Sequence, residues 1–256
     1  MSDFKIYNSD YGQFVVNQYC KFQGEALETT GKTHIEEELE RMYLIIDSLS
    51  EGAVVIDGGA NIGFVTVPLS RRLESKSAKI LSFEAQKRLF YALAGTVAIN
   101  DLYNVHVYNQ ALGDTIGVVR MPDVNYHEVD DYGSVSIDSE VPAFDYTDPN
   151  LTQMVTIDSL NLPKVDFIKL DVEGYEPNAI RGADKTIKAH RPWLWVEYNN
   201  CQGSYIHETI KAVVNQIAPE YSHWFITDDG QNMICAPNEK LSQVNLPYIT
   251  DKWRGW

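Results

Sequence analysis

The stretch Val54–Phe64, VVIDGGANIGF, decides the fold that we expect of this chain. It starts as a short apolar strand, reaches an acid at Asp57 and then passes through a glycine-rich turn that opens a helix. Glycines in such a turn let the backbone approach a ligand closely. The stretch therefore predicts a ligand site at the carboxyl end of a buried strand, although a tight turn without a ligand remains an alternative.

The residues of this turn narrow the choice of ligand. The dinucleotide fingerprint G-x-G-x-x-G fails, because Ala60 and Asn61 stand where its second glycine would be. The phosphate-binding P-loop fails as well, because no Gly-Lys-Ser/Thr follows. A carboxylate at Asp57 would also repel a pyrophosphate. S-adenosylmethionine (SAM) has no phosphate, and its ammonium, sulfonium and ribose diol are compatible with acidic partners, so the turn favours SAM.

On both sides of this turn, short apolar runs alternate with longer amphipathic stretches. The strand-like runs are 53–56, 79–83, 105–108, 165–170 and 193–196, and the helical stretches are 62–74, 86–100 and 175–190. Apolar strands separated by helices indicate a parallel sheet covered on both faces. Two further runs, 224–227 and 233–236, flank a turn and predict a hairpin, so the sheet ends with an antiparallel strand. We expect a doubly wound, mostly parallel α/β fold.

The chain length of 256 residues suggests one full-sized domain. We expect an N-terminal cap over residues 1–50, with a short strand at 14–16 and a helix at 34–48, then the ligand-binding domain over 51–240 and a tail over 241–256. Residues 114–160 interrupt the alternation with strand-like pieces at 116–120, 134–137 and 154–157. This stretch is too long for an ordinary connection, so we interpret it as an excursion over the ligand end of the sheet.

Acids stand where the other strands end. Glu84 follows the second strand, 27 residues after Asp57, and is placed to accept hydrogen bonds from ribose hydroxyls. NAD sites use an acid at a similar place, so Glu84 favours a nucleoside ligand without separating SAM from NAD. The loop Asn109–Asp114 after the third strand is where adenine would lie, or is a plain turn.

The fourth strand leads into Asp171, Glu173 and Glu176, and the fifth ends at Glu197. Acids at the carboxyl end of a central strand can take a proton, orient a hydroxyl or hold a cation. Glu176 alone suits the start of a helix better. We therefore take Asp171, Glu173 and Glu197 as candidates to orient or deprotonate an acceptor.

Several motifs together resemble those of the FkbM-type SAM-dependent methyltransferases, from about Glu36 to Ala236. The matching segments are DGGANIG at 57–63, FE at 83–84, ALGD at 111–114, TIDSL at 156–160 and IKLDVEGYE at 168–176. The resemblance implies a Rossmann-like class I methyltransferase fold with a seven-stranded sheet, and O-methylation of sugars or natural products.

The resemblance also implies roles for individual residues. The methionine end of SAM would be lined by Asp57, Gly59, Asn61 and Gly63, the ribose by Glu84, and the adenine side by Gln110 and Ala111, with Asp171 also near the cofactor. Ser134 and Ser136 lie in a segment similar to one near the substrate. Two features depart from the family: Ala85-Gln86 replaces a usual proline, and Pro68 is expected to kink the helix after the turn.

The composition excludes several other classes of protein. A net charge of −15 disfavours general nucleic-acid binding. Three widely spaced cysteines indicate neither a disulfide framework nor a cysteine-based zinc site, and the six histidines show no ligand spacing, so no metal ligand is assigned and a need for a divalent metal is not predicted. His127, in the excursion, is kept as a possible base near the substrate. No basic leader and no apolar run of about 20 residues is present, so we expect a cytoplasmic protein without a membrane span.

The sequence thus predicts a SAM-dependent methyltransferase that acts on a hydroxyl of a saccharide or small molecule. The bound sulfonium would already activate the methyl group, so the protein would mainly position the reactants and remove a proton. A nicotinamide-dependent oxidoreductase and a non-catalytic binding module on the same fold remain alternatives. The acceptor and the oligomeric state are not predicted.

Overall fold

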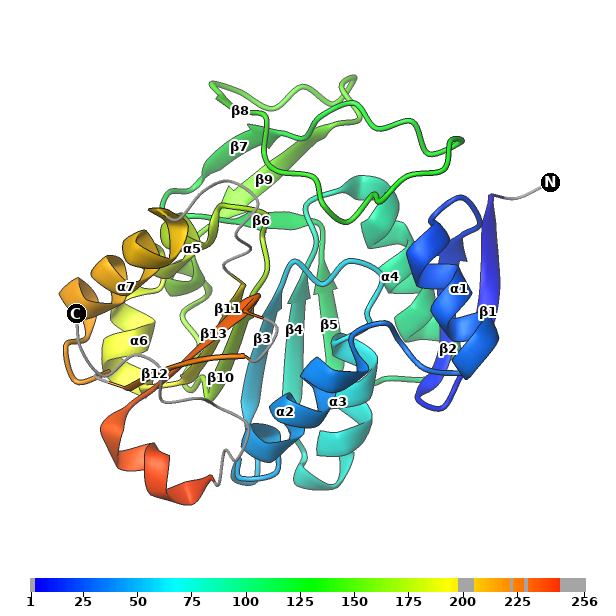
Figure 1. Ribbon diagram of the computed structural model, residues 1–256. Helices are drawn as coiled ribbons and strands as arrows, with labels where there is room; N and C mark the ends of the chain where they lie inside the picture. Colours follow the sequence, from blue (N-terminus) through cyan, green and yellow to red (C-terminus); the bar gives the residue numbers. More distant parts are fainter. Residues whose placement is uncertain (1–2, 198–204, 222, 228–229, 245–256) are drawn as a thin grey trace.

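The computed structural model describes residues 3–197, 205–221, 223–227 and 230–244. Its main sheet has the strand order β12-β13-β11-β10-β3-β4-β5 (Figure 1). The strands are β3 (Val54–Gly58), β4 (Lys79–Phe83), β5 (Val105–Tyr108), β10 (Phe167–Leu170), β11 (Trp193–Glu197), β12 (His223–Ile226) and β13 (Asn232–Ala236). The prediction of an α/β fold is confirmed.

Strands β11, β10, β3, β4 and β5 are parallel to one another, whereas β13 is antiparallel to both β11 and β12. The antiparallel strand therefore lies one place inside the edge of the sheet and does not form the edge itself. The reason is that β13, the second strand of the hairpin, pairs with β11 and leaves β12 outside.

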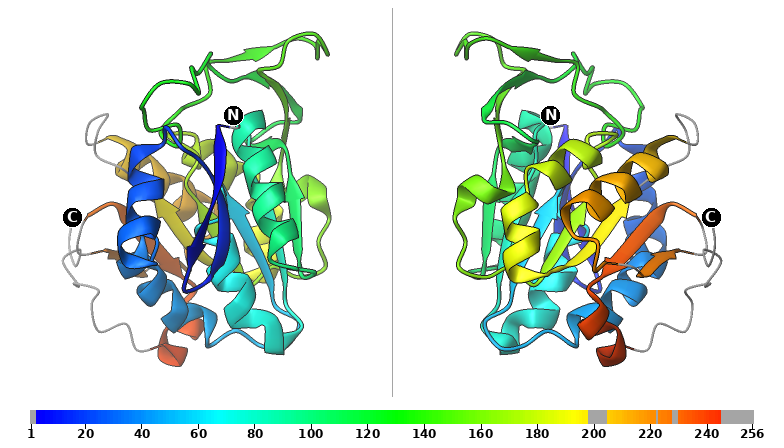
Figure 2. Two further views of the ribbon diagram at one scale, coloured as in Figure 1. Left: turned by 90° about the vertical axis from the view of Figure 1, so that its right-hand side faces the viewer. Right: turned by 90° about the vertical axis from the view of Figure 1, so that its left-hand side faces the viewer.

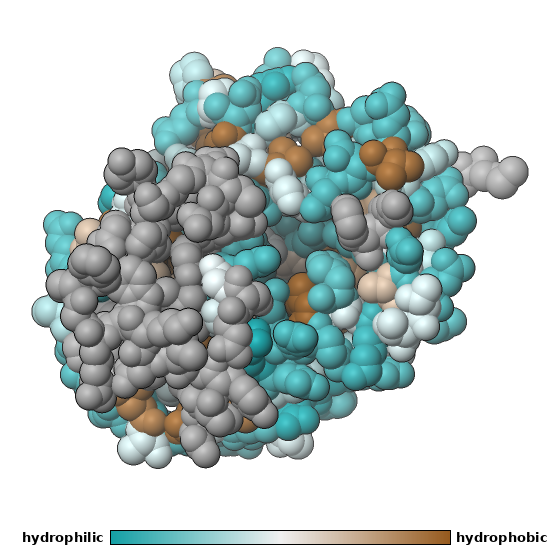
Figure 3. Space-filling model, in the orientation of Figure 1, coloured by the Kyte–Doolittle hydropathy of each residue, from teal (hydrophilic) through white to brown (hydrophobic). Residues whose placement is uncertain are grey.

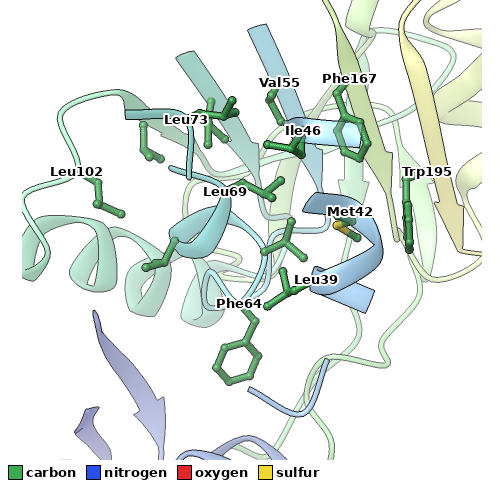
Figure 4. Close-up of a cluster of buried hydrophobic side chains, with 14 of the residues drawn as sticks. Leu39, Met42, Ile46, Val55, Phe64, Leu69, Leu73, Leu102, Phe167 and Trp195 are labelled. Atoms are coloured by element: carbon green, nitrogen blue, oxygen red, sulfur yellow. The ribbon is translucent and has the colours of Figure 1, made fainter. Parts of the chain in front are cut away.

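Helices cover both faces of this sheet, as the two side views show (Figure 2). On one face α2 (Glu36–Ile46), α3 (Thr66–Leu73) and α4 (Lys87–Ile99) pack with Val55, Phe167 and Trp195 (Figure 4). On the other face α5 (Glu176–Arg181), α6 (Asp184–His190) and α7 (Tyr205–Ile217) pack with Ile56, Ile168 and Val196. Since successive strand residues point to opposite faces, both sets must be apolar, which explains the continuous apolar runs in the sequence.

The N-terminal segment holds more structure than the sequence suggests. β1 (Phe4–Ser9) and β2 (Gly12–Asn17) form an antiparallel hairpin, and α1 (Lys21–Thr30) follows it. The Val15 N–H donates to Thr96 Oγ1 at 3.0 Å, which fixes β2 on α4. The sequence predicts only the middle of β2 and the helix α2. The rest of the hairpin lacks the clear alternation of a strand, and α1 lacks a clear helical spacing of apolar residues.

The excursion forms a second, four-stranded sheet in the order β6-β9-β7-β8. Its strands are β6 (Gln110–Leu112), β7 (Gly117–Arg120), β8 (Ser139–Val141) and β9 (Leu151–Val155). The prediction of a strand at 134–137 is wrong. This segment pairs with no other described strand and instead lies along the cavity at the ligand end of the main sheet. The piece expected at 154–157 ends early, since the short 3-10 helix η2 (Ile157–Leu160) begins there.

Two helical expectations also change. Pro68 does not interrupt a helix, because α3 begins at Thr66 and its first turn needs no N–H from the third residue. The helix expected at 175–190 divides into α5 and α6 around Gly182, where a Cβ would lie 1.9 Å from the Gly113 carbonyl oxygen. Asp158, from the TIDSL motif, accepts hydrogen bonds from the N–H groups of Lys185 and Thr186 at the start of α6.

Two short 3-10 helices complete the described chain, η1 (Glu74–Lys76) and η4 (Asn238–Gln243). The division into a cap, a binding domain and a tail stays a prediction, and the tail from residue 245 onward lies outside the described residues. Among the described helices, none combines the length and the hydropathy needed to cross a membrane.

Candidate functional site

A cavity of about 980 Å³ opens at the carboxyl ends of β3, β4, β10 and β11. This volume lies at the upper end of the range of roughly 300–1,000 Å³ that is usual for small-molecule sites. On the face shown in Figure 3 the surface is hollowed below the excursion, and mostly hydrophilic residues surround the hollow. Six of the predicted cofactor residues line this cavity: Gly59, Asn61, Glu84, Gln110, Ala111 and Asp171.

The glycine-rich turn is held tightly against its neighbours. The N–H groups of Gly59 and Ala60 both donate to the Phe83 carbonyl at the end of β4, at 3.0 and 2.9 Å. Gly59 has a φ of +73°, and a Cβ on it would lie 1.7 Å from the Asp171 carbonyl oxygen. Only glycine fits there, so the turn must run directly beside the loop that carries the acids.

Glu84 lies beside this turn, and its side chain faces the cavity although the residue is only 6% exposed. One carboxylate oxygen accepts the Asn61 N–H at 2.9 Å and the other accepts the Gln86 N–H at 2.8 Å. Burial raises the pKa of Glu84 to about 7, and these two backbone hydrogen bonds oppose the rise. Each oxygen still has a lone pair with which to accept a ligand hydroxyl.

Gln86 connects Glu84 with the excursion. It belongs to the pair Ala85-Gln86, which replaces the proline that is usual in the family. Its Nε2 donates to the Tyr132 carbonyl at 2.7 Å, and the Tyr126 hydroxyl donates to its Oε1 at 2.9 Å. The sequence did not mark Gln86 as a site residue. Its contacts show that the excursion is anchored at the side of the cavity where adenine was expected.

Asp57 and Gly63, two further predicted cofactor residues, do not line the cavity. Asp57 is fully buried, and its Oδ2 accepts a hydrogen bond from Thr66 Oγ1 at 2.6 Å. Gly63 has a φ of +104°, and a Cβ on it would lie 3.2 Å from a methyl of Leu93, so it lets α4 pack close to the turn. Both residues therefore support the conformation of the turn without lining the cavity.

Lys169, on the central strand β10, is another residue at the site that the sequence did not mark. Its ammonium lies 3.0 Å from the Gly59 carbonyl oxygen, 3.1 Å from Asp171 Oδ2 and 3.5 Å from Asp57 Oδ1. Burial would lower the pKa of Lys169, but the carboxylates of Asp171 and Asp57 raise it, so the ammonium stays charged. A lysine inside an otherwise apolar strand is the signal that could have revealed it.

The predicted catalytic acids Asp171, Glu173 and Glu197 do come together, with one carboxylate oxygen of each within 4.8 Å of the others. Burial would raise the pKa of Asp171, yet the Lys169 ammonium and a hydrogen bond with Glu197 outweigh it and lower this pKa. Burial and the Asp171 charge raise the pKa of Glu197 well above neutrality. At pH 7 Asp171 is therefore a carboxylate and Glu197 a carboxylic acid that donates to it.

Glu173 differs from both of these acids. Burial, followed by the charges of Asp171 and Glu176, raises its pKa to about 8, close to the range in which a general base works best. Its backbone has a φ of +55°, and its carbonyl accepts a hydrogen bond from Ser136 Oγ at 2.6 Å. Glu176 itself turns inward, where its carboxylate accepts the N–H groups of Val172 and Gly174 at 2.8 and 3.2 Å.

The spacing of the three acids also suits a divalent cation, whose preferred ligands are carboxylate oxygens. In this structure the Lys169 ammonium already supplies positive charge at Asp171, and the proton shared by Glu197 and Asp171 joins two of the three acids. The sequence assigns no metal ligand and does not predict whether a divalent metal is needed, so this question stays open to the experiment with EDTA and Mg²⁺ described below.

The three predicted acceptor residues have different surroundings. Ser134 lines the cavity, and its hydroxyl donates to Asp131 Oδ2 at 2.9 Å. Ser136 does not line the cavity, but its hydroxyl donates a hydrogen bond to the Glu173 carbonyl. His127 is outside the lining; its side chain is 70% exposed and its Nδ1 lies 3.2 Å from Asp3 Oδ2.

The N-terminal cap supplies a wall of the cavity that the sequence did not predict. Gln23 of α1 donates through Nε2 to Asn61 Oδ1 at 3.2 Å. His34 also lines the cavity, and its pKa is lowered by burial, so it stays neutral at pH 7. Of these two histidines, His34 therefore lines the cavity and His127 does not, because the segment between α1 and α2 lies at the cavity wall.

Comparison with known proteins agrees with this geometry. The family model of the methyltransferase FkbM domain matches residues 57–224, which is more than half of the chain. No curated protein matches the sequence.

Solved structures share the fold at low sequence identity. Methyltransferase FkbM from Methylobacillus flagellatus KT is 19% identical with a TM-score of 0.53, and the match covers 73% of this chain and 44% of that one. The chain thus spans less than half the length of that protein. A putative rRNA methylase from Clostridium thermocellum is 9% identical with a TM-score of 0.50, and the match covers 80% of this chain and 96% of that one. These similarities concern the fold alone.

Proposed function

Because this chain belongs to the methyltransferase FkbM domain family, we propose that it transfers a methyl group from SAM to a hydroxyl of a saccharide or another small molecule. The observation that carries the proposal is the single cavity in which the Gly59 turn and Glu84 face the acids Asp171 and Glu173. A cofactor side and an acceptor side are thereby adjacent.

The residues present fit SAM. Glu84 has free lone pairs for a ribose diol, and the turn at Gly59 and Asn61 brings backbone to the cavity wall. Nine acidic residues belong to the described lining, and no lysine or arginine does. Such a lining favours a ligand with a net positive charge, as SAM has, over a pyrophosphate.

The chain's own residues would prepare the acceptor. Bound SAM supplies a methyl group that its sulfonium charge already activates. Asp171, held ionised by Lys169, would accept a hydrogen bond from the acceptor hydroxyl and orient it. Glu173, with a pKa near 8, would take the hydroxyl proton. Glu197 is protonated at neutral pH, so it supports Asp171 and does not itself serve as the base.

The acidic lining also bears on the acceptor. A phosphorylated or carboxylated acceptor would meet repulsion from the ionised Asp171 and the other acidic residues of the lining. An uncharged, hydroxyl-rich molecule has no such penalty, and the hydroxyl of Ser134 and the side chain of Gln110 offer it hydrogen bonds. This supports a neutral saccharide or natural product over a nucleic acid.

Thermal denaturation tests the cofactor. SAM and S-adenosylhomocysteine (SAH) should each raise the melting temperature, because a ligand that binds only the folded state stabilises it, by about 2.7 kcal/mol at a concentration of 100 Kd. NAD should give no shift. No shift at millimolar SAM would contradict the proposal, and transfer of a labelled methyl group to a panel of neutral hydroxyl compounds would separate an enzyme from a binding module.

The Glu84→Ala variant examines the ribose contact. We expect its SAM affinity in calorimetry to fall by roughly 1.5–3 kcal/mol, the scale of hydrogen bonds to a charged group. Glu74→Ala, which alters an exposed acid in η1, is the control and should bind SAM normally. Unchanged affinity in Glu84→Ala would remove the ribose role.

A further inference from the structure

Lys169 places a charged side chain in the buried middle of the sheet, and neither solvent nor the cavity accounts for this charge. The residue is 5% exposed and does not line the cavity. It lies on β10, which pairs with β3 on one side and with β11 on the other. Its position is therefore fixed by two parallel ladders, and only its side-chain end can reach the ligand edge.

Three oxygens surround the Lys169 ammonium, and an ammonium has three N–H donors. They belong to Asp57 at the end of β3, to the Gly59 carbonyl in the turn and to Asp171 at the exit of β10. Oδ1 of Asp57 is buried without a hydrogen-bond partner among the described residues, and the Lys169 ammonium, 3.5 Å away, forms an ion pair with it. The ammonium thus joins three separate chain segments at one point.

We propose that Lys169 is a positioning residue whose ammonium holds the Gly59 turn and the Asp171 carboxylate at a fixed separation and so shapes the cofactor side of the cavity. This inference rests on the proposed function, because the ligand concerned is SAM. Lys169 acts through Gly59 and Asp171, both of which line the cavity.

Removing the charge would have a defined consequence. Without the ammonium, the carboxylates of Asp57 and Asp171 would repel each other in a poorly solvated site, and the Gly59 carbonyl would lose its hydrogen bond. Asp171 can relieve the repulsion by moving toward the cavity, where its side chain is 37% exposed. The turn would then lose its support where it meets the ligand.

The affinities of SAM and SAH for Lys169→Met test the proposal, because SAM carries one more positive charge than SAH. A displaced turn weakens both ligands alike, so calorimetry should show both affinities falling by a similar factor of about 10- to 100-fold, the range expected between residues in one network. A pure field effect would instead favour SAM over SAH, and unchanged affinities in a folded variant would mean that Lys169 serves stability alone. Either result would overturn the inference.

Lys164→Met provides the matched control. Lys164 is partly exposed, precedes β10 in the chain and pairs with Asp166 at 3.3 Å, so its loss removes a surface ion pair without reaching the cavity. This variant should bind SAM and SAH as the unaltered protein does. A loss equal to that of Lys169→Met would overturn the inference, since any lysine near the strand would then have the same effect.

The double variant Lys169→Met/Asp171→Asn keeps the test decisive if the single variant does not fold, because both opposite charges leave together. It should bind SAH more weakly than Asp171→Asn, since the Gly59 carbonyl still lacks its donor. Equal SAH affinity in these two variants would overturn the positioning role. If the unaltered protein bound neither SAM nor SAH, the proposed function would fail, and this inference with it.

Discussion

Glu173 is the carboxylate whose surroundings best suit proton transfer. Its pKa of about 8 lies between the lowered pKa of Asp171 and the raised pKa of Glu197, although all three acids occupy one cluster. The difference arises because, of these three acids, only Asp171 forms an ion pair with Lys169, and Glu197 donates its proton in a hydrogen bond to Asp171. Neighbouring acids thus acquire different pKa values through their partners.

This difference predicts a pH dependence. Glu173 is protonated below its pKa of about 8 and becomes a base above it, so turnover at saturating SAM should rise as the pH increases through 8. Glu173→Gln should lose this rise and roughly 10²- to 10⁴-fold of the rate. The measurement is the initial rate of labelled methyl transfer between pH 6 and 10.

Glu51→Gln, which alters an exposed acid, is the control and should keep the whole profile. The profile should also be the same with EDTA and with added Mg²⁺. A rate rise that persists in Glu173→Gln would exclude Glu173 as the base, and a profile that EDTA removes would point to a cation at the acid cluster.

At the scale of elements, the site depends on the close contact between the turn after β3 and the loop after β10. Gly59 makes this contact possible, because its Cα passes so near the Asp171 backbone that no side chain fits. The excursion is joined to both of these segments by hydrogen bonds. Ser136 donates to the Glu173 carbonyl, and Gln86 donates to the Tyr132 carbonyl. The turn at Gly59, the acid loop and the excursion are therefore linked by direct contacts.

Gly59→Ala should abolish this arrangement. Its Cβ would collide with the Asp171 carbonyl, so we expect a large drop in melting temperature and the loss of SAM binding in calorimetry. Gly52→Ala is a matched control, because Gly52 has a similar φ of +66° and nothing lies within 4 Å of the added Cβ. The control should lose roughly 2–8 °C from backbone strain alone and bind SAM normally. Normal binding by Gly59→Ala would show that the contact is dispensable.

At the scale of the whole molecule, charge is the dominant feature. The chain carries a net charge of −15, and the described lining of the cavity is acidic as well. Such a field attracts cations from a distance and is screened by salt, since the Debye length shortens from about 10 Å at 0.1 M to about 3 Å at 1 M.

The field predicts a difference between two otherwise similar ligands. Raising the salt concentration from about 0.05 to 0.5 M should weaken the binding of the positively charged SAM by roughly threefold or more and leave SAH, which has no net charge, nearly unaffected. Calorimetry at the two salt concentrations measures both. Equal salt dependence of the two ligands would mean that the acidic lining does not act on the sulfonium.

Local sequence patterns are sufficient to predict most strands of the sheet and several residues of the cavity where we expect the cofactor. The strands at Lys79–Phe83 and Val105–Tyr108 have the predicted bounds, because a strand covered on both faces must be apolar throughout and ends where polar residues begin. Gly59, Asn61 and Glu84 could be expected together in one cavity for a related reason. The carboxyl ends of parallel strands meet at one edge of the sheet.

The positions of Lys169, Gln86, His34 and His127 relative to the cavity become apparent only in the folded chain. A local pattern reports a residue's neighbours along the chain, whereas the partners of Lys169 at Asp57 and Gly59 are about 110 residues away and meet it only because β10 lies beside β3. His127 was chosen for its place in the excursion, but the excursion turns it outward while the cap brings His34 in. Charges buried by long-range packing have no periodicity in the sequence, so their function becomes visible only in the folded chain.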